Sequence, residues 1–354
     1  MFHLEFKNLM TFPFCRHRRG CVLAAFSLVT AVLTHVFVLD SAQAGTLRTQ
    51  QIQLQKGWNS VFLEVFPVVS APEVVFANAP VSIVASHFPL NSSVEFVTDP
   101  SRTNWKKEGW GVWYAPGRED AFLTTLHAID GNRAYLIYAN SDFTWQLEGN
   151  VLFERRRWKA DSFNLTGFGV DEVSPPTFGK FFAASKPHAQ KLIYRLVNER
   201  WAKVTAPDAT SMKSGEACWV YCQGASDYQG PLSVTIPFGT TVVFGTHDAG
   251  LANIVLGNGS TDPITIKADS GDGGLPVSCV LKGLARDHVE NVLVDLTAPY
   301  SLPVMEAGTQ TSFTLQVRRE KMGQSFQSSL MKISTDSGVR VWLPLAAQRE
   351  DLAQ

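Results

Sequence analysis

Charged residues are scarce in this sequence, and neither sign is in clear excess. They make up 18% of the 354 residues, with 31 Lys and Arg against 32 Asp and Glu. Sequence-independent binding to nucleic acid or to an anionic membrane needs a clustered cationic surface. The charge balance therefore argues against both, and we expect no nucleic-acid partner.

The motifs of the common catalytic sites are also missing. The chain has no His-Glu-x-x-His, no Gly-x-Ser-x-Gly and no Gly-x-x-x-x-Gly-Lys-Ser/Thr, which would hold a zinc ion, a nucleophilic serine and a nucleotide phosphate respectively. Residues 269–274 resemble the start of a calcium loop, but Val280 stands where that loop needs a bidentate Glu. We therefore predict a flexible loop there, no metal, no cofactor and no catalytic residue.

Cysteine is rare as well. Of five cysteines, only Cys218, Cys222 and Cys279 lie beyond residue 44. Cys218 and Cys222 are four residues apart on a probable strand, about 13 Å, which is too far for them to bridge each other. Two interpretations remain: Cys279 pairs with Cys218 or with Cys222, or all three are buried as small hydrophobic side chains.

A long hydrophobic run occurs once, at residues 21–39. It follows the basic residues 16–19 and precedes Ala42-x-Ala44, an order typical of a secretory signal peptide that is cleaved before Gly45. The alternative is an uncleaved membrane anchor, because the run is just long enough to cross a bilayer. Cleavage leaves 27 basic and 30 acidic residues, a formal charge of −3. We predict a secreted or periplasmic protein, with attachment to the cell surface as an alternative, and no membrane span after cleavage.

The sequence is rich in aromatic residues (11%), in Gly (26) and in Pro (18), a composition that favours strands and turns. Apolar residues alternate at 51–55 and 60–65, on either side of a turn at Lys56 and Gly57. Two short helices are predicted, one after the N-cap Ser70 and one over residues 119–126. The fold class is therefore mainly β with minor α.

An internal repeat organises the first two thirds of the chain. The pattern at residues 57–62 recurs at 162–168, that at 70–76 recurs at 174–181, and that at 131–138 recurs at 215–221. We predict a strand-rich α+β module over residues 45–152 and a shorter, degenerate copy of it over 153–236. An immunoglobulin-like β-sandwich follows at 237–348, and a tail at 349–354.

Two resemblances accompany this division. Gly57-Trp58-Asn59 and Gly131-x-x-Ala134-Tyr135 resemble a module common in secreted bacterial proteins, a likeness that implies no catalytic residues. Short alternating strands about ten residues apart after Pro237 are typical of an immunoglobulin-like sandwich. Within them, residues 243–245 and 256–260 resemble immunoglobulin-like domains of the abnormal-spindle and hydin type. That resemblance implies an interaction or spacer module.

Two local clusters are candidate binding sites. Flat rings beside polar groups stack on sugars, so an aromatic group in the first module predicts a glycan platform, with packing in the core as the alternative. The group consists of Trp105, Trp110, Trp113 and Tyr114, with Arg118 beside them. The basic run at residues 155–159, at the junction of the two modules, is either a solvated linker or a contact for an anionic glycan or lipopolysaccharide.

These features favour a non-catalytic, secreted binding or scaffold protein of the bacterial cell envelope or extracellular space. Its partners would be other envelope or extracellular proteins, or glycans. A carbohydrate-binding protein that uses the aromatic platform is the second hypothesis. A hydrolase without a recognisable motif, with His127 or His87 beside a carboxylate, is the third.

Overall fold

The computed structural model describes residues 46–89, 97–102, 104–106, 109–246, 250–271, 274–285 and 288–349. The predicted signal peptide lies outside these residues, as does most of the predicted tail. In the described ranges, no helix has the length and apolar character needed to cross a membrane.

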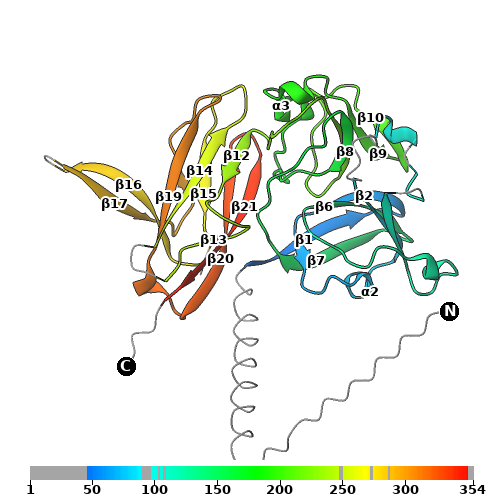
Figure 1. Cartoon of the computed structure of the whole chain (residues 1–354), viewed down its shortest axis with the longest axis horizontal. Helices are drawn as coiled ribbons and strands as arrows, with labels where there is room; N and C mark the ends of the chain where they lie inside the picture. The colour runs from blue at the N-terminus through cyan, green and yellow to red at the C-terminus, as the bar shows by residue number, and fades with distance from the viewer. Residues whose placement is uncertain are drawn as a thin grey trace, which may run out of the picture. The chain divides into compact units, whose positions relative to one another are not determined.

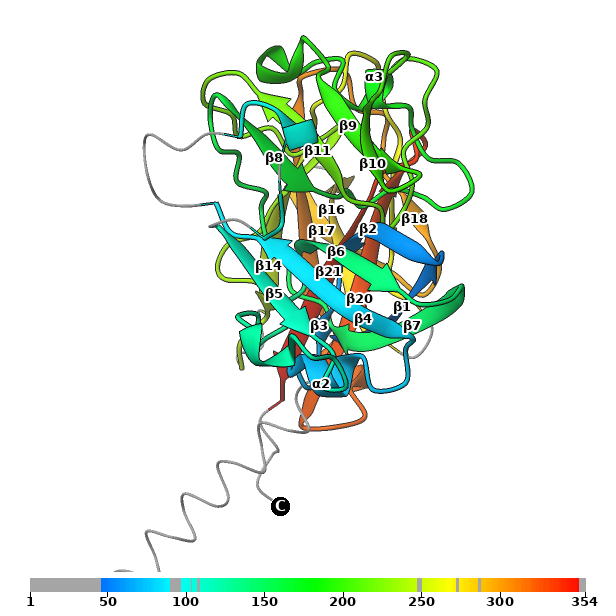
Figure 2. The same ribbon diagram turned by 90° about the vertical axis from the view of Figure 1, so that its right-hand side faces the viewer.

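The first part of the chain forms two antiparallel sheets (Figure 1). One has the order β1-β7-β3 and the other β2-β6-β4-β5, whose strands Figure 2 shows side by side. The strands are β1 (Leu47–Leu54), β2 (Gly57–Leu63), β3 (Phe66–Pro67), β4 (Val81–His87), β5 (Trp110–Tyr114), β6 (Arg133–Ala139) and β7 (Phe143–Asn150). In β1, Ile52 and Leu54 are buried while Gln51 and Gln53 are exposed, as the alternation predicts. The strands β1 and β2 flank Lys56 but belong to different sheets.

The short helices differ from the sequence prediction. Helix α2 (Pro72–Val75) begins after Ala71 rather than Ser70, and no side chain caps it. The helix expected over 119–126 shrinks to the single turn η3 (Ala121–Leu123). The chain after η3 bonds to β5 instead, because the backbone N–H groups of Thr125 and Leu126 both donate to the carbonyl of Val112. The chain there follows the edge of a sheet, so it cannot form the next helical turn.

The second part contains one four-stranded sheet in the order β10-β9-β11-β8. Its elements are β8 (Ser162–Thr166), α3 (Phe178–Phe181), η4 (Lys186–His188), β9 (Ile193–Val197), β10 (Arg200–Lys203) and β11 (Cys218–Cys222). The Thr177 side chain caps α3 by accepting a hydrogen bond from the backbone N–H of Lys180. The strands that carry the first and last repeat landmarks pair antiparallel in both parts, β2 with β6 and β8 with β11. The repeat itself stays a prediction.

The last part is an immunoglobulin-like β-sandwich. One sheet has the order β12-β14-β19-β16-β17 and the other β13-β21-β20-β15-β18. Without β17, the order β12-β14-β19-β16 corresponds to strands A, B, E and D of the immunoglobulin fold. Without β18, the order β13-β21-β20-β15 corresponds to strands A′, G, F and C. The elements are β12 (Leu232–Thr235), β13 (Val242–Val243), β14 (Leu251–Asn258), β15 (Ile266–Asp269), β16 (Val277–Ala285), β17 (His288–Asp295), β18 (Tyr300–Ser301), β19 (Gln310–Val317), η5 (Arg319–Lys321), β20 (Phe326–Thr335) and β21 (Arg340–Gln348). The strand β12 precedes residue 237, where the sequence places the start of this domain.

The hydrophobic core does not follow the three predicted parts. One cluster of buried side chains runs from Phe168 and Phe181 in the second part to Phe313 and Leu345 in the sandwich, while the first part has a cluster of its own around Tyr135. The second part and the sandwich therefore share a core.

The short η2 (Pro100–Arg102) lies in the first part, and the β16–β17 hairpin projects from the sandwich (Figure 1).

Candidate functional site

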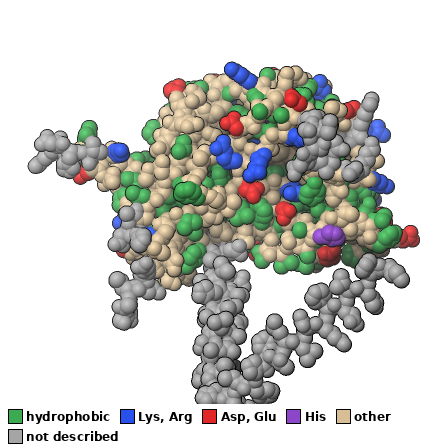
Figure 3. Space-filling view, in the orientation of Figure 1, with side chains coloured by type: hydrophobic (Ala, Val, Ile, Leu, Met, Phe, Trp, Pro, Cys, Tyr) green, Lys and Arg blue, Asp and Glu red, His purple; other side chains and the backbone are tan. Residues whose placement is uncertain are grey.

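A cleft of about 1950 Å³ lies where the three parts meet. The first part contributes Glu64 and Trp110, the second Phe163, and the sandwich Thr235 and Arg340, with residues 151–159 between them. Its lining has six basic side chains, Arg133, Arg155, Arg156, Arg157, Lys159 and Arg340, against three acidic ones, Glu64, Glu154 and Asp227. This cationic lining contrasts with the near neutrality of the whole chain. Figure 3 shows Lys and Arg side chains gathered near the middle of one face, with acidic side chains beside them.

The basic run is held in place by hydrogen bonds. The backbone N–H of Arg156 donates to Gln229 Oε1 at 2.7 Å, and Gln229 Nε2 donates back to the Arg156 carbonyl at 3.0 Å. The indole N–H of Trp158 donates to the carbonyl of Tyr228 at 2.7 Å, and the N–H of Phe153 donates to the carbonyl of Thr240 at 2.9 Å. The segment is therefore a fixed wall of the cleft, although Arg155 and Arg157 on it are exposed to solvent, as a solvated linker would be.

Arg156 is the unusual member of this wall. Its Nε donates to Thr166 Oγ1 at 3.1 Å and one terminal nitrogen donates to the carbonyl of Gly167 at 2.5 Å. The guanidinium carbon lies 4.3 Å from the ring centre of Phe168. No carboxylate in the described part of the chain pairs with it. Burial of this charge lowers the pKa of Arg156 to about 10, so the surroundings favour an added anion.

The arginines on either side of it are exposed. Arg155 donates to Thr235 Oγ1 at 3.4 Å, a long hydrogen bond to a neutral group, and the described residues offer Arg157 no hydrogen bond or ion pair. Both are one residue from the half-buried Arg156, so all three positive charges stay within one short stretch of the cleft wall.

A buried arginine joins the three parts. Arg340, at the start of β21, donates to Glu64 at 2.8 and 3.2 Å. It also donates to the carbonyl of Val170 at 2.9 Å and to Ser214 Oγ at 2.9 Å. The Arg340 side chain is 4% exposed and that of Glu64 is 9% exposed. Arg48 donates to the same carboxylate at 2.7 Å. This network fixes the positions of the cleft walls.

Aromatic rings of the first part form another wall of the cleft. His87 and Trp110 have ring centres 5.2 Å apart, and Phe88 lies beside them with Arg133 over its ring at 4.4 Å. Burial, followed by the charge of Lys159, lowers the pKa of His87 to about 4. His87 is therefore neutral at neutral pH and serves as a flat ring. The nearby charge that acts on it is a cation rather than the carboxylate that a hydrolase would need.

The predicted aromatic platform is divided among separate surroundings. Trp113 is 3% exposed, stacks on Phe76 and donates to Glu73 Oε1 at 3.0 Å. Tyr114 is 9% exposed and belongs, with the half-buried Trp105 and Trp110, to another cluster. Arg118 pairs with Asp120 at 2.7 Å, away from the cleft. Of the five residues, only Trp110 lines the cleft, so they do not form one surface. The ligand-binding role of these residues stays a prediction.

The three cysteines are buried and free, so the disulfide considered for Cys279 is not formed. Burial raises the pKa of each thiol, which keeps it in the less reactive protonated form. Within the described residues, no group of three His, Cys, Asp or Glu side chains gathers as metal ligands would. His127 is exposed, and part of the predicted loop at 269–274 lies outside the described residues.

The sequence missed the residues that build the cleft. Glu64 and Arg340 are 276 positions apart, so no local pattern connects them. The basic run did mark one wall. The sequence held one further signal for the cleft. This signal is Glu64, a polar residue at the end of an apolar strand-like run.

No family model matches the chain, and no curated protein matches it. Among solved structures, the ASH / PapD-like domain of human CEP192 matches over 35% of this chain and 87% of that domain, with 13% identity and a TM-score of 0.23. The Enterococcus faecalis MSCRAMM ACE matches over 86% of this chain and 90% of its own, with 7% identity and a TM-score of 0.20. The secreted serine protease VesC from Vibrio cholerae matches over 78% and 70%, with 14% identity and a TM-score of 0.20. Likeness this remote says nothing about ligand or activity, and the sandwich rests on its own strand order.

Proposed function

We propose that this protein is a non-catalytic, secreted bacterial binding protein that holds its ligand in the cleft between its three parts. The observation that carries the proposal is the buried Arg340–Glu64 network, which holds the walls of a large cleft in fixed positions. A site that is already formed loses less entropy when a ligand binds. The predicted signal peptide supports export, and N-terminal sequencing of the exported protein should begin at Gly45.

The binding test compares two variants that each add one bulky ring. Thr235 is exposed and lines the cleft, so Thr235→Trp narrows it. Thr205 is exposed and outside the lining, so Thr205→Trp is the matched control. A panel of neutral and acidic oligosaccharides and peptides is screened by thermal shift, because a ligand that binds the folded state raises the melting temperature.

We expect at least one panel member to stabilise the wild type and the Thr205→Trp variant, and to stabilise Thr235→Trp much less. Equal stabilisation of both variants would place the ligand outside the cleft and contradict the proposal. So would turnover of any panel member that a single substitution abolishes.

A further inference from the structure

We propose that the cleft binds an acidic polysaccharide, with Arg155, Arg156 and Arg157 taking its carboxylates and the aromatic wall taking its sugar rings. This inference rests on the proposed function and adds the chemical class of the ligand. The sequence predicts the basic run and the aromatic platform as two separate candidate sites, and this inference combines them in one site.

The Arg156 guanidinium is half-buried and has no carboxylate partner among the described residues. A charge that is partly removed from water is unfavourable unless hydrogen bonds and an anion compensate it. Two of its three nitrogens donate to Thr166 and Gly167, and the third makes no hydrogen bond in the described structure. The planar fork of a guanidinium matches a carboxylate, so an acidic ligand supplies the missing partner.

Arg156 is fixed in place before any ligand arrives. The backbone N–H and the backbone carbonyl of Arg156 both form hydrogen bonds with the Gln229 side chain. The Arg156 side chain donates to Thr166 and Gly167. Arg155 and Arg157 flank it on the same wall and are exposed. Three cations at consecutive positions, the middle one held in place, match a polymer with a repeated negative charge better than a single small anion.

The cleft also has an aromatic lining. His87, Phe88, Trp110 and Trp158 all line the same cleft as the arginines. Phe88 is 38% exposed, and the Trp110 and Trp158 rings are half-buried. Flat apolar rings stack on sugar faces, whereas an acidic peptide or a polyphosphate has no need of them. The rings therefore favour a sugar as the carrier of the negative charge.

The size of the cleft favours a large ligand. Pockets for small molecules have volumes of about 300–1,000 Å³. The cleft, at about 1950 Å³, exceeds that range. It has room for several sugar units, so an oligosaccharide stretch of a longer chain fits better than a single sugar.

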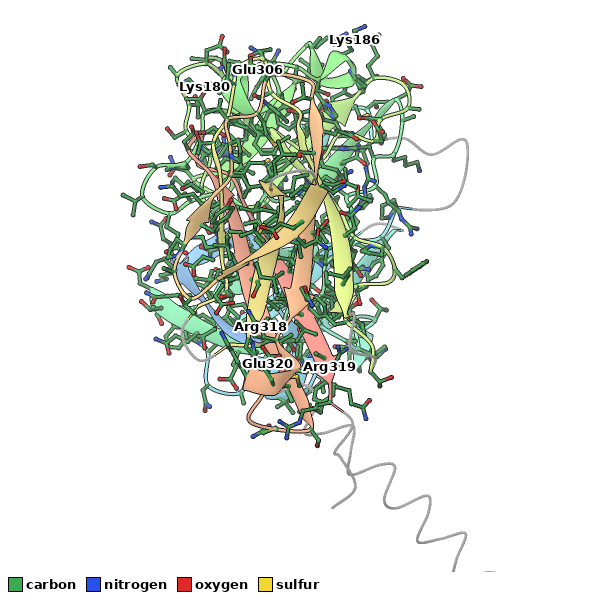
Figure 4. All side chains as sticks on the ribbon, turned by 90° about the vertical axis from the view of Figure 1, so that its left-hand side faces the viewer. Lys180, Lys186, Glu306, Arg318, Arg319 and Glu320 are labelled. Carbon is green, nitrogen blue, oxygen red and sulfur yellow. The ribbon has the colours of Figure 1, made fainter. Side chains whose placement is uncertain are left out.

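The experiment uses calorimetry on the purified exported protein with two acidic polysaccharides, polygalacturonate and alginate. Neutral dextran, poly-L-glutamate and polyphosphate are the comparison ligands. The test variant is Arg155→Glu/Arg157→Glu. The matched control is Lys180→Glu/Lys186→Glu, which makes the same charge change at two exposed lysines outside the cleft lining, both labelled in Figure 4. Melting temperatures verify that both variants fold.

We expect polygalacturonate or alginate to bind the wild type, and to bind more weakly as salt rises, because the charges are partly exposed. Arg155→Glu/Arg157→Glu should lower the affinity at least about tenfold, and the lysine control should stay within about twofold. Arg156→Gln should also weaken binding, while Arg156→Lys should recover only part of it because lysine lacks the planar fork.

Three results would overturn the inference: no binding of either acidic polysaccharide, equal loss in the test and control variants, or equal affinity for poly-L-glutamate or polyphosphate. If a neutral ligand still distinguishes Thr235→Trp from Thr205→Trp, the proposed function stands and only the ligand class is wrong. If no ligand distinguishes them, both fail.

Discussion

Arg340 and Arg156 line the same cleft, but their charges are balanced in different ways. Arg340 is paired with the carboxylate of Glu64 and bonded to two further groups from the second part of the chain. Arg156 has a hydroxyl, a carbonyl and aromatic rings around it, and no carboxylate among the described residues. The first arrangement is complete without a ligand. The second becomes complete when an anion binds.

A third arginine shows that a missing carboxylate does not by itself indicate a site. Arg319, labelled in Figure 4, is 8% exposed and donates to the carbonyls of Phe244, Gly245 and Gln348. It lies outside the cleft lining, and its role is to hold the chain at β13 close to the end of β21. Arg156 differs because a large cleft, two further arginines and exposed rings adjoin it.

Removing Arg340 should have the largest effect on stability. Arg340→Met leaves the buried Glu64 with Arg48 as its one remaining cation, and breaking a buried pair costs about 3 kcal/mol or more. Urea unfolding followed by tryptophan fluorescence measures the loss. Because Arg340 also joins the three parts, limited proteolysis near residues 151–161 should become faster in this variant.

The matched control is Arg318→Met, the same substitution in the same domain. Arg318 pairs with Asp295 and Glu320 at the surface, so its removal should change stability little (Figure 4). The double variant Arg340→Met/Glu64→Gln should recover part of the loss because it removes the unbalanced carboxylate. Equal stability of Arg340→Met and Arg318→Met would show that the network does not hold the parts together.

A backbone contact next to Arg340 tests the same junction without changing charge. Gly338 has a φ of +81°, and a Cβ there would lie 2.0 Å from the carbonyl oxygen of Ser174. Gly338→Ala should therefore cost about 2 kcal/mol. Gly323→Ala is the control, because nothing lies within 4 Å of its Cβ position. A melting temperature that falls equally in both variants would argue against a tight junction.

Much of the fold could be predicted from the sequence because strands have a local signal. The alternation of Gln51, Ile52, Gln53 and Leu54 gives β1 directly, and the spacing of short strands after Pro237 indicates the sandwich. The helix expected around Phe122 failed because backbone bonds to Val112 on β5 overrode local preference. The sharing of one core by the second part and the sandwich has no local signal at all.

The cleft could be predicted only in pieces. Residues 155–159 are visible as a basic run, but their hydrogen bonds to Gln229 and Tyr228 depend on chain segments about 70 positions away. The aromatic group was visible too, although alternation along β5 sends Trp110 and Trp113 to different surroundings. Local patterns revealed the residue types, and tertiary packing decided which of them meet.

Two histidines, the half-buried His87 and the buried His188, predict how the cleft region responds to acid. Burial lowers the pKa of both His87 and His188 to about 4, while the unfolded chain binds protons near 6.5. The unfolded state therefore binds more protons in between, so this contribution is fully present above about pH 6.5 and is lost as the pH falls toward 4. We expect the stability to fall by about 1 kcal/mol or more per histidine from about pH 7.5 to about pH 5.

Urea unfolding at several pH values checks this, with His87→Gln as the test variant and the exposed His127→Gln as the control. His87→Gln should show a shallower loss on acidification than the wild type and the control. Identical slopes in all three proteins would mean that His87 is protonated without cost in the fold, and that the aromatic wall is open to solvent.

The smallest effect on stability should come from Arg156, although it is the residue on which ligand binding depends most. Arg156→Gln removes a charge that has no carboxylate partner. The loss of its two hydrogen bonds is therefore offset, because the cost of taking that charge out of water also disappears. We expect a change of less than about 1 kcal/mol in urea unfolding, against about 3 kcal/mol for Arg340→Met. A loss as large as that of Arg340→Met would show that Arg156 holds the second part together. In that case the contrast between a structural and a ligand-binding arginine would not hold.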